Sequence, residues 1–223
     1  NVYISLDNGW TAAPDTYAGK VILDKFAAYA QNENPDMKWS IAYHGYSYPL
    51  TRCDFWNDNT YTTNSVSTRY ISMKNINVLT EYAGTLEKKY DKPAGSIRII
   101  LSEQGYNAGQ GADIQAEALA LGYYIAEFND RIDAFIIRAV IDDADEMRGG
   151  LYLGIHTWDE KKRTSFYVYE FMDSNLDDFA NTAPERVSTG NLSKVKTAKY
   201  ILCNTDWESK VPNFSRSKLA RMY

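Results

Sequence analysis

Four apolar runs, each followed by a segment with helical spacing, limit the fold of this chain more than any other feature. The runs lie at Val2–Leu6, Trp39–Tyr43, 97–101 and 134–141. A strand–helix order repeated in this way favours parallel pairing of the strands through right-handed crossovers. The run at 97–101 is apolar at nearly every position, which is typical of a strand buried on both faces. We therefore predict an α/β fold with a parallel sheet.

Helices are expected after each strand. They are predicted at about 15–31, from Ser72 as the N-cap to about residue 90, from about 114 to 128, and at about 165–172. A further helix is predicted near 193–202.

Four strand–helix units are half of the eight in a (β/α)8 barrel. An open sheet of four strands would leave two apolar edges unpaired, which is a liability for a soluble protein. The chain also opens directly on a strand, without an initiator methionine or a signal segment. We therefore expect a TIM-type half-barrel, forming a single domain over residues 1–223 with a helical tail from about residue 185.

Charge and composition narrow the classes of partner. The net charge is -5, so the chain lacks the basic surface that binds nucleic acid. No apolar run approaches the 18 residues of a membrane span, and none is predicted. The 18 tyrosines and 5 tryptophans often stand in polar contexts. Exposed aromatic rings of this kind suit sugar binding, although packing in the core explains most of them more simply.

Glu103 is the first candidate for chemistry. It stands in Leu-Ser-Glu-Gln-Gly-Tyr-Asn, directly after the apolar run at 97–101. The C-terminal ends of barrel strands form the floor of the active site, so Glu103 is expected to point its charge into a cleft.

The strand ends resemble the second half of a clan GH-A glycoside hydrolase barrel, strands five to eight. The resemblance covers about residues 1–175 and is greatest to a poorly characterised bacterial family of glycoside-hydrolase-like (β/α)8 proteins. The stretches that carry it are Asp-Asn-Gly-Trp at 7–10, Trp-Ser-Ile-Ala-Tyr-His at 39–44, Leu-Ser-Glu-Gln-Gly at 101–105, Ile-Asp-Ala-Phe-Ile at 132–136 before Arg138, and Leu-Gly-Ile at 153–155 before Asp-Glu-Lys-Lys at 159–162. The glutamate of strand seven is the most specific of these elements.

The resemblance implies that Glu103 is the nucleophile of a retaining glycosidase. In that clan the general acid/base lies at the end of strand four, which has no counterpart in this chain. A retaining enzyme needs two carboxyl groups about 5–5.5 Å apart, because one carboxylate cannot attack and protonate at the same time. The acid/base is therefore expected outside this chain, with Asp7, Asp142 and Glu146 as weaker local candidates.

Eight further residues are candidates for substrate binding. Trp10 and Trp56 are candidate stacking platforms, and either Tyr43 or Tyr46 could donate a hydrogen bond to Glu103. His44 could bind a sugar hydroxyl, orient Glu103, or be satisfied within its loop. Arg138 stands inside an apolar strand and needs a carboxylate partner, which Glu103 or Asp142 could provide. It could bind substrate, or its ion pair could be purely structural. The full set is Asn8, Trp10, Tyr43, His44, Tyr46, Trp56, Gln104 and Arg138.

No metal or cofactor is expected. The acidic run at 142–146 could hold calcium, but it lacks the spacing and the glycine of an EF-hand, so a solvated loop is favoured. Zinc spacing, a phosphate-binding loop and a Gly-x-Ser-x-Gly elbow are missing from the sequence. Cys53 and Cys203 could form a disulfide or could be two buried free thiols, and the sequence leaves this open.

Three hypotheses follow for function. The first is a retaining glycoside hydrolase acting on a poly- or oligosaccharide. The second is a non-catalytic carbohydrate-binding barrel. The third is a structural half-barrel that pairs with a second copy. The expected partners are thus a carbohydrate and either an N-terminal half-barrel or another copy of the chain. A secreted or cell-surface location is expected, with the cytoplasm as the alternative.

Overall fold

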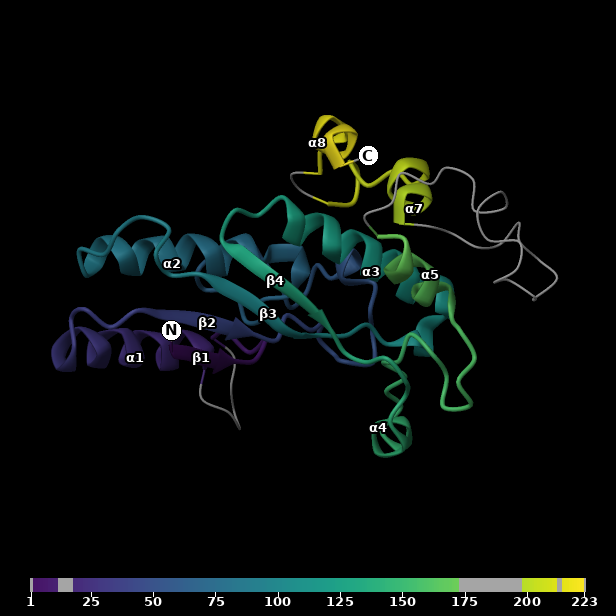
Figure 1. Cartoon of the computed structure of the whole chain (residues 1–223), viewed down its shortest axis with the longest axis horizontal. Coiled ribbons are helices and arrows are strands. Elements are labelled where there is room, and N and C mark those ends of the chain that lie inside the picture. Colours follow the sequence, from purple (N-terminus) through teal and green to yellow (C-terminus); the bar gives the residue numbers. More distant parts are fainter. Residues whose placement is uncertain (1, 12–17, 173–197, 212–213, 223) are drawn as a thin grey trace. The chain divides into compact units, whose positions relative to one another are not determined.

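A parallel sheet of four strands forms the framework of the protein (Figure 1). The computed structural model describes residues 2–11, 18–172, 198–211 and 214–222. The strands are β1 (Val2–Leu6), β2 (Trp39–Tyr43), β3 (Ile99–Gln104) and β4 (Ile132–Ile137). They pair side by side in sequence order, and all three pairings are parallel. The predicted α/β class and parallel sheet are confirmed.

Two strands differ from the prediction at both of their ends. β1 and β2 match it, whereas β3 starts at Ile99 and runs on to Gln104, through an irregularity in its register with β4. β4 starts at Ile132 rather than at residue 134. It ends at Ile137 rather than at residue 141. The reason is that Ala139 and Val140 exchange backbone hydrogen bonds with the segment 153–156 instead of continuing along β3.

The helices follow the strands as expected, and the predicted start of the first one at about residue 15 lies outside the described residues. Ser72 caps a 3-10 turn, η2 (Met73–Asn75), in a reciprocal capping box with Asn75, and the α-helix begins directly after it. The predicted tail helix at 193–202 lies partly outside the described residues. The helices are α1 (Gly19–Glu33), α2 (Asn77–Lys89), α3 (Ala112–Glu127), α4 (Ala144–Arg148), α5 (Thr164–Glu170), α7 (Ala198–Asn204) and α8 (Arg216–Met222).

The contacts divide the chain into two compact units. The first unit consists of residues 1–50, 57–104 and 125–138 and holds all four strands with α1 and α2. The second unit consists of residues 51–56, 105–124 and 139–223. The single domain over 1–223 stays a prediction, as does the tail from about 185, whose first residues lie outside those described.

The core of the first unit forms between the sheet and the helices that run alongside it (Figure 1). Leu23 of α1 and Leu79 of α2 are fully buried, and Phe26 of α1 packs edge-on against Trp39 at 5.2 Å between ring centroids. β2 is buried at all five positions. This continuous burial is what its apolar sequence predicts for an inner parallel strand.

The two outer strands are much more exposed than β2. In β1, Val2 and Tyr3 are 49% and 44% exposed, and in β4 Ile136 is 49% exposed. β1 pairs only with β2, and β4 only with β3, within the described part of the chain. The sheet therefore has two open parallel edges that carry apolar side chains.

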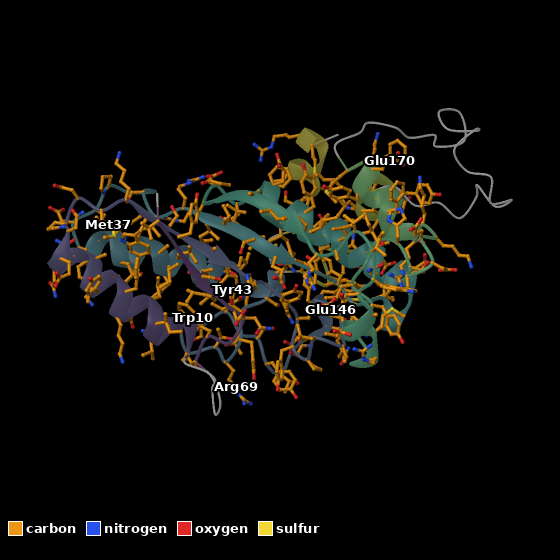
Figure 2. The ribbon with its side chains drawn as sticks, turned by 60° about the horizontal axis from the view of Figure 1, so that its bottom comes forward. Trp10, Met37, Tyr43, Arg69, Glu146 and Glu170 are labelled. Atoms are coloured by element: carbon orange, nitrogen blue, oxygen red, sulfur yellow. The ribbon has the colours of Figure 1, made fainter. Side chains whose placement is uncertain are left out.

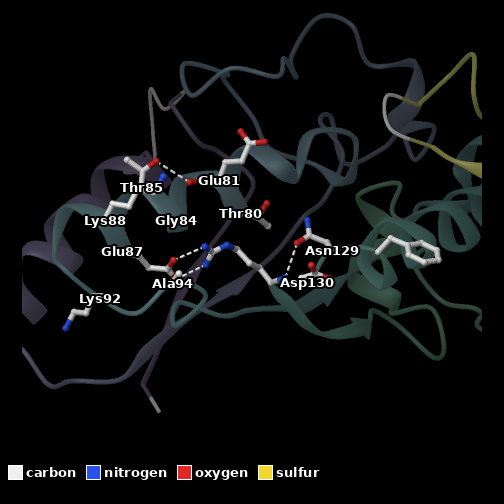
Figure 3. Close-up of a pocket in the computed structure, with 12 residues that line it drawn as sticks. Thr80, Glu81, Gly84, Thr85, Glu87, Lys88, Lys92, Ala94, Asn129 and Asp130 are labelled. Atoms are coloured by element: carbon white, nitrogen blue, oxygen red, sulfur yellow. Dashed lines mark hydrogen bonds and ion pairs between the residues drawn. The ribbon is translucent and has the colours of Figure 1, made fainter. Parts of the chain in front are cut away.

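A buried ion pair stabilises the end of the sheet at which the strands begin (Figure 3). The carboxylate of Glu87 on α2 accepts two hydrogen bonds of 2.7 Å from Arg131, which directly precedes β4, and further bonds from the backbone of Gly95 and Ile97. Burial alone would raise the pKa of Glu87, but the bonds from Arg131 and the two backbone N–H groups outweigh it and the pKa lies below its usual value. The pair ties α2 to the starts of β3 and β4.

A second buried ion pair organises the second unit. Arg163 donates to both carboxylate oxygens of Asp142, at 2.8 and 2.6 Å, and also to the carbonyl of Gly154. The backbone N–H of Gly154 in turn donates to Asp142. The Asp142 side chain is 1% exposed and that of Arg163 is 11% exposed. The guanidinium of Arg163 thus connects its own segment to those of Asp142 and Gly154, although these segments form no regular sheet.

Both cysteines are free. Cys53 is buried, as expected, and its burial, together with the charge of Asp54, raises the pKa of its thiol to about 12. Cys203 is exposed, so the expectation of two buried thiols is wrong for this residue. Within the described residues, no helix has the length and apolar character needed to cross a membrane.

Candidate active site

Glu103 lies near the C-terminal end of β3, where two other elements bring donors to its carboxylate. The hydroxyl of Tyr46, in the loop after β2, donates to Glu103 Oε1 at 2.6 Å. Arg138, which follows β4, places its Nε 3.6 Å from the same oxygen. The Glu103 side chain is 40% exposed. Of the two donors considered in the sequence, Tyr46 is therefore the partner, and Glu103 rather than Asp142 pairs with Arg138.

The two oxygens of Glu103 are not equivalent. Oε1 receives both the phenol and the guanidinium, and a short phenol–carboxylate bond is among the stronger hydrogen bonds in proteins. Oε2 accepts no hydrogen bond from the described residues. The carboxylate is thus held in one orientation through one oxygen, while the other oxygen is available to a ligand.

The loop that carries Tyr46 is fixed by two side-chain amides. Asn8, directly after β1, donates from Nδ2 to the carbonyls of Tyr46 and Ser47 at 3.0 and 3.4 Å. Gln104 donates from Nε2 to the carbonyl of Gly45 at 3.2 Å. A Cβ at Gly45 would lie 2.7 Å from Gln104 Oε1, so a larger residue there would displace the amide of Gln104. Gln104 is 1% exposed, so the prediction that it binds substrate is wrong, because its side chain is used inside the fold.

His44 has a different partner from the one considered in the sequence. Its Nδ1 lies 2.9 Å from Asp7 Oδ1, and the side chains are 23% and 82% exposed. The idea that His44 orients Glu103 is therefore not supported by its hydrogen bonding. The possibility that it binds a sugar hydroxyl stays a prediction.

Three of the predicted substrate-binding aromatics are core residues, of which Trp10 and Tyr43 are labelled in Figure 2. Trp10 is fully buried, donates its indole N–H to the carbonyl of Val66 and packs edge-on against Tyr82. Tyr43 is also fully buried, and its hydroxyl donates to the carbonyl of Ile71.

Trp56, in the second unit, is 5% exposed and packs against Trp207 at 5.1 Å. These contacts correct the prediction, because the rings of Trp10, Tyr43 and Trp56 have no free face for a sugar.

The local candidates for an acid/base are largely occupied. Asp142 is buried in its pair with Arg163, which makes it a structural residue. Asp7 is engaged by His44, and Glu146 lies on the short helix α4. Asp143 caps that helix by accepting from the backbone of residues 145 and 146. The acidic run therefore serves local structure, and in the described residues no cluster of three or more His, Cys, Asp or Glu could hold a metal ion.

A tyrosine cluster near this site was missed in the sequence. Tyr48 stacks on Tyr70 with ring centroids 3.9 Å apart, and Tyr61 packs edge-on against Tyr48 at 4.8 Å. The signal was present, since the polar segment from 43 to 70 carries an unusual density of tyrosines. The contact among Tyr48, Tyr61 and Tyr70 could not be predicted, because periodicity does not show which loop residues meet.

Two pockets of the first unit lie away from Glu103. One of about 630 Å³ is lined by α2 and by Arg131, next to the buried pair with Glu87 (Figure 3). Another, of about 660 Å³, is lined by Trp39 and Ile97 at the starts of β2 and β3. Both lie at the N-terminal ends of the strands, the end that in barrel folds serves stability rather than chemistry.

The sequence matches the family described as "Family of unknown function (DUF5722)" over residues 1–195. The chain belongs to this family. The DUF5722 match includes Asn8, Tyr46, Glu103 and Arg138, so the whole site lies within the family region. No curated protein matches the chain. DUF5722 membership thus defines a relationship and assigns no activity.

Proposed function

We propose that this DUF5722 protein is a retaining glycoside hydrolase that acts on a poly- or oligosaccharide, with Glu103 as its nucleophile. One observation carries the proposal: a half-exposed carboxylate at the C-terminal end of an inner parallel strand, oriented through one oxygen by Tyr46 and Arg138. This is the end of a parallel strand at which α/β enzymes place their chemistry.

The geometry suits nucleophilic attack. Oε2 of Glu103 bonds to the anomeric carbon as the bond to the leaving oxygen breaks, and water then cleaves the glycosyl ester with return of the carboxylate. Tyr46 and Arg138 stay on Oε1 and keep the carboxylate aimed. The leaving oxygen takes its proton from a second carboxyl group, which the proposal places outside this chain.

The experiment that tests the proposal is turnover of a panel of activated aryl glycosides, followed by proton NMR of the first sugar released. A retaining enzyme releases a product with the anomeric configuration of its substrate. Release of the opposite anomer would assign a different mechanism to the site.

Replacing Tyr46 by phenylalanine is expected to lower kcat/KM about 10- to 100-fold, because a hydrogen bond to a charged group is worth about 1.5–3 kcal/mol. The substitution removes only the hydroxyl that holds Glu103 Oε1. Steady-state kinetics on an aryl glycoside measures the effect. Tyr29→Phe on α1 is the matched control, since Tyr29 is 60% exposed and is not among the described contacts of Glu103, Tyr46 or Arg138. Equal rates in the two variants would contradict the role given to Tyr46.

The same proposal requires the sheet to close into a (β/α)8 barrel. The open apolar edges at β1 and β4 support this, since exposed parallel edges are uncommon in soluble proteins. Four further strands would come from an N-terminal half-barrel or from a second copy of the chain.

Mass measurement in solution tests closure. A particle larger than the 25.4 kDa of this chain is expected, either as a longer polypeptide or as a dimer. A monodisperse monomer of this chain's mass, with no other polypeptide present, would exclude closure in either form.

A non-catalytic carbohydrate-binding barrel is the second candidate. It is favoured by the fact that the hydrogen-bonding and ionic partners of Glu103 in the described residues are a phenol and a guanidinium rather than a second carboxyl group. Sugar binding without hydrolysis of any aryl glycoside would select this candidate over the enzyme.

A further inference from the structure

The tyrosine cluster of Tyr48, Tyr61 and Tyr70 lies on the same loop system as the partner of Glu103. Tyr48 is two residues after Tyr46, so the two Cα atoms are at most about 7 Å apart. Asn8 binds the carbonyls of Tyr46 and Ser47, which restrains the chain between them. The position of Tyr48 is therefore coupled directly to that of the residue that orients the carboxylate.

The cluster is held from behind by backbone hydrogen bonds. Tyr70 donates its N–H to the carbonyl of Tyr61, Ile71 donates to the carbonyl of Asn8, and Trp10 donates to the carbonyl of Arg69. The segment 69–71 is thus fastened to the end of β1, and the tyrosines project from an ordered base. An ordered base reduces the entropy that a ligand must overcome to bind.

The rings themselves form a layered surface. The rings of Tyr48 and Tyr70 are nearly parallel, with 14° between their planes, and Tyr61 makes a T-shaped contact with each of them. Tyr48 is 37% exposed, in contrast to the fully buried Tyr43 of the same region. A hydrogen bond with the Tyr48 hydroxyl raises the pKa of Tyr70. The cluster is thus an aromatic surface made of two stacked rings and a third ring set edge-on to both.

We propose that Tyr48, Tyr61 and Tyr70 form a sugar-stacking subsite that binds a residue of an oligosaccharide next to the sugar at Glu103. The apolar C–H face of a pyranose fits an aromatic ring, and the tyrosine hydroxyls can bond its rim. This inference rests on the proposed function and narrows its substrate class to chains of several sugars rather than monoglycosides.

Calorimetric titration of the full-length protein tests the subsite. The probes are the hexasaccharides of cellulose, xylan, mannan and laminarin, together with maltohexaose, titrated into the Glu103→Gln protein so that they stay intact. At least one is expected to bind, and Tyr48→Ala in the same background is expected to weaken that binding about tenfold. Tyr48→Phe, which keeps the ring, should retain most of the affinity.

Tyr29→Ala is the matched control, because Tyr29 is an exposed tyrosine on α1 without a described ring partner. Thermal unfolding followed by circular dichroism checks that each variant is folded, and Tyr70→Leu replaces Tyr48→Ala if the latter is not. Equal affinity in the Tyr48 and Tyr29 variants overturns the subsite, as does binding of none of the five probes. Tyrosine-dependent binding in a protein that hydrolyses no aryl glycoside would overturn the proposed catalysis and leave the subsite standing.

Discussion

Replacing Glu103 by glutamine is expected to reduce the hydrolysis of an activated aryl glycoside on the order of 10⁴-fold or more, because loss of a covalent nucleophile removes the reaction path itself. Glutamine keeps the shape of the side chain, and its amide oxygen can still accept the bond from Tyr46. Folding and sugar binding should therefore be retained. Initial rates with a dinitrophenyl glycoside measure the loss.

The matched control for this substitution is Glu33→Gln, at the exposed C-terminal end of α1. A second variant separates a nucleophile from a residue that merely stabilises charge. In Glu103→Ala, added azide can enter the vacated space and attack the anomeric carbon, which yields a glycosyl azide of inverted configuration while the aryl group leaves without protonation. Unchanged turnover in Glu103→Gln would end the proposal that this carboxylate is the nucleophile.

Replacing Arg163 by methionine is expected to lower the free energy of unfolding by about 3–5 kcal/mol, the usual cost of leaving one member of a buried ion pair uncompensated. The Asp142 carboxylate is 1% exposed and would lose both guanidinium bonds, while the carbonyl of Gly154 would lose one donor. Urea unfolding followed by circular dichroism measures the change. Methionine preserves much of the volume, so the effect reports charge rather than a cavity.

Arg148→Met is the control for this experiment. Arg148 pairs with Asp145 on α4, but their side chains are 72% and 80% exposed, and such a pair contributes at most about 1 kcal/mol. The double variant Asp142→Leu/Arg163→Met should recover part of the stability, because it leaves no buried charge behind. A loss in Arg163→Met no larger than in Arg148→Met would show that Asp142 is not isolated from water as the structure indicates.

The regular framework of this protein could be predicted well from sequence, because burial and periodicity determine it. β2 was bounded correctly at Trp39–Tyr43, since five consecutive buried positions leave a strong local signal. The end of β4 was not predicted correctly, because Ala139 pairs with a loop at 153–156 and no local sequence pattern indicates that pairing.

The same distinction holds for the candidate site: features set by the local sequence could be predicted, and features set by the tertiary fold could not. Glu103 could be found because a carboxylate directly follows an apolar strand. The choice between Tyr43 and Tyr46 could not be made, since it depends on which side of β2 each ring faces and on how the loop after it turns. Trp10 was misjudged because its polar neighbours in the sequence suggest exposure, whereas the segment 66–70 folds over it and accepts its indole N–H.

The hydrogen bonds of Asn8 couple the effects of substitutions at Tyr46, Tyr48 and Tyr70. One side chain restrains the loop between Tyr46 and Tyr48, and the backbone of Asn8 also anchors Ile71, beside Tyr70. Effects of substitutions at these positions should accordingly be non-additive, as is usual for residues that share one hydrogen-bond network. On the proposed function, altering the length of sugar chain that binds will then also disturb the orientation of the Glu103 carboxylate, so the two traits have to be optimised jointly.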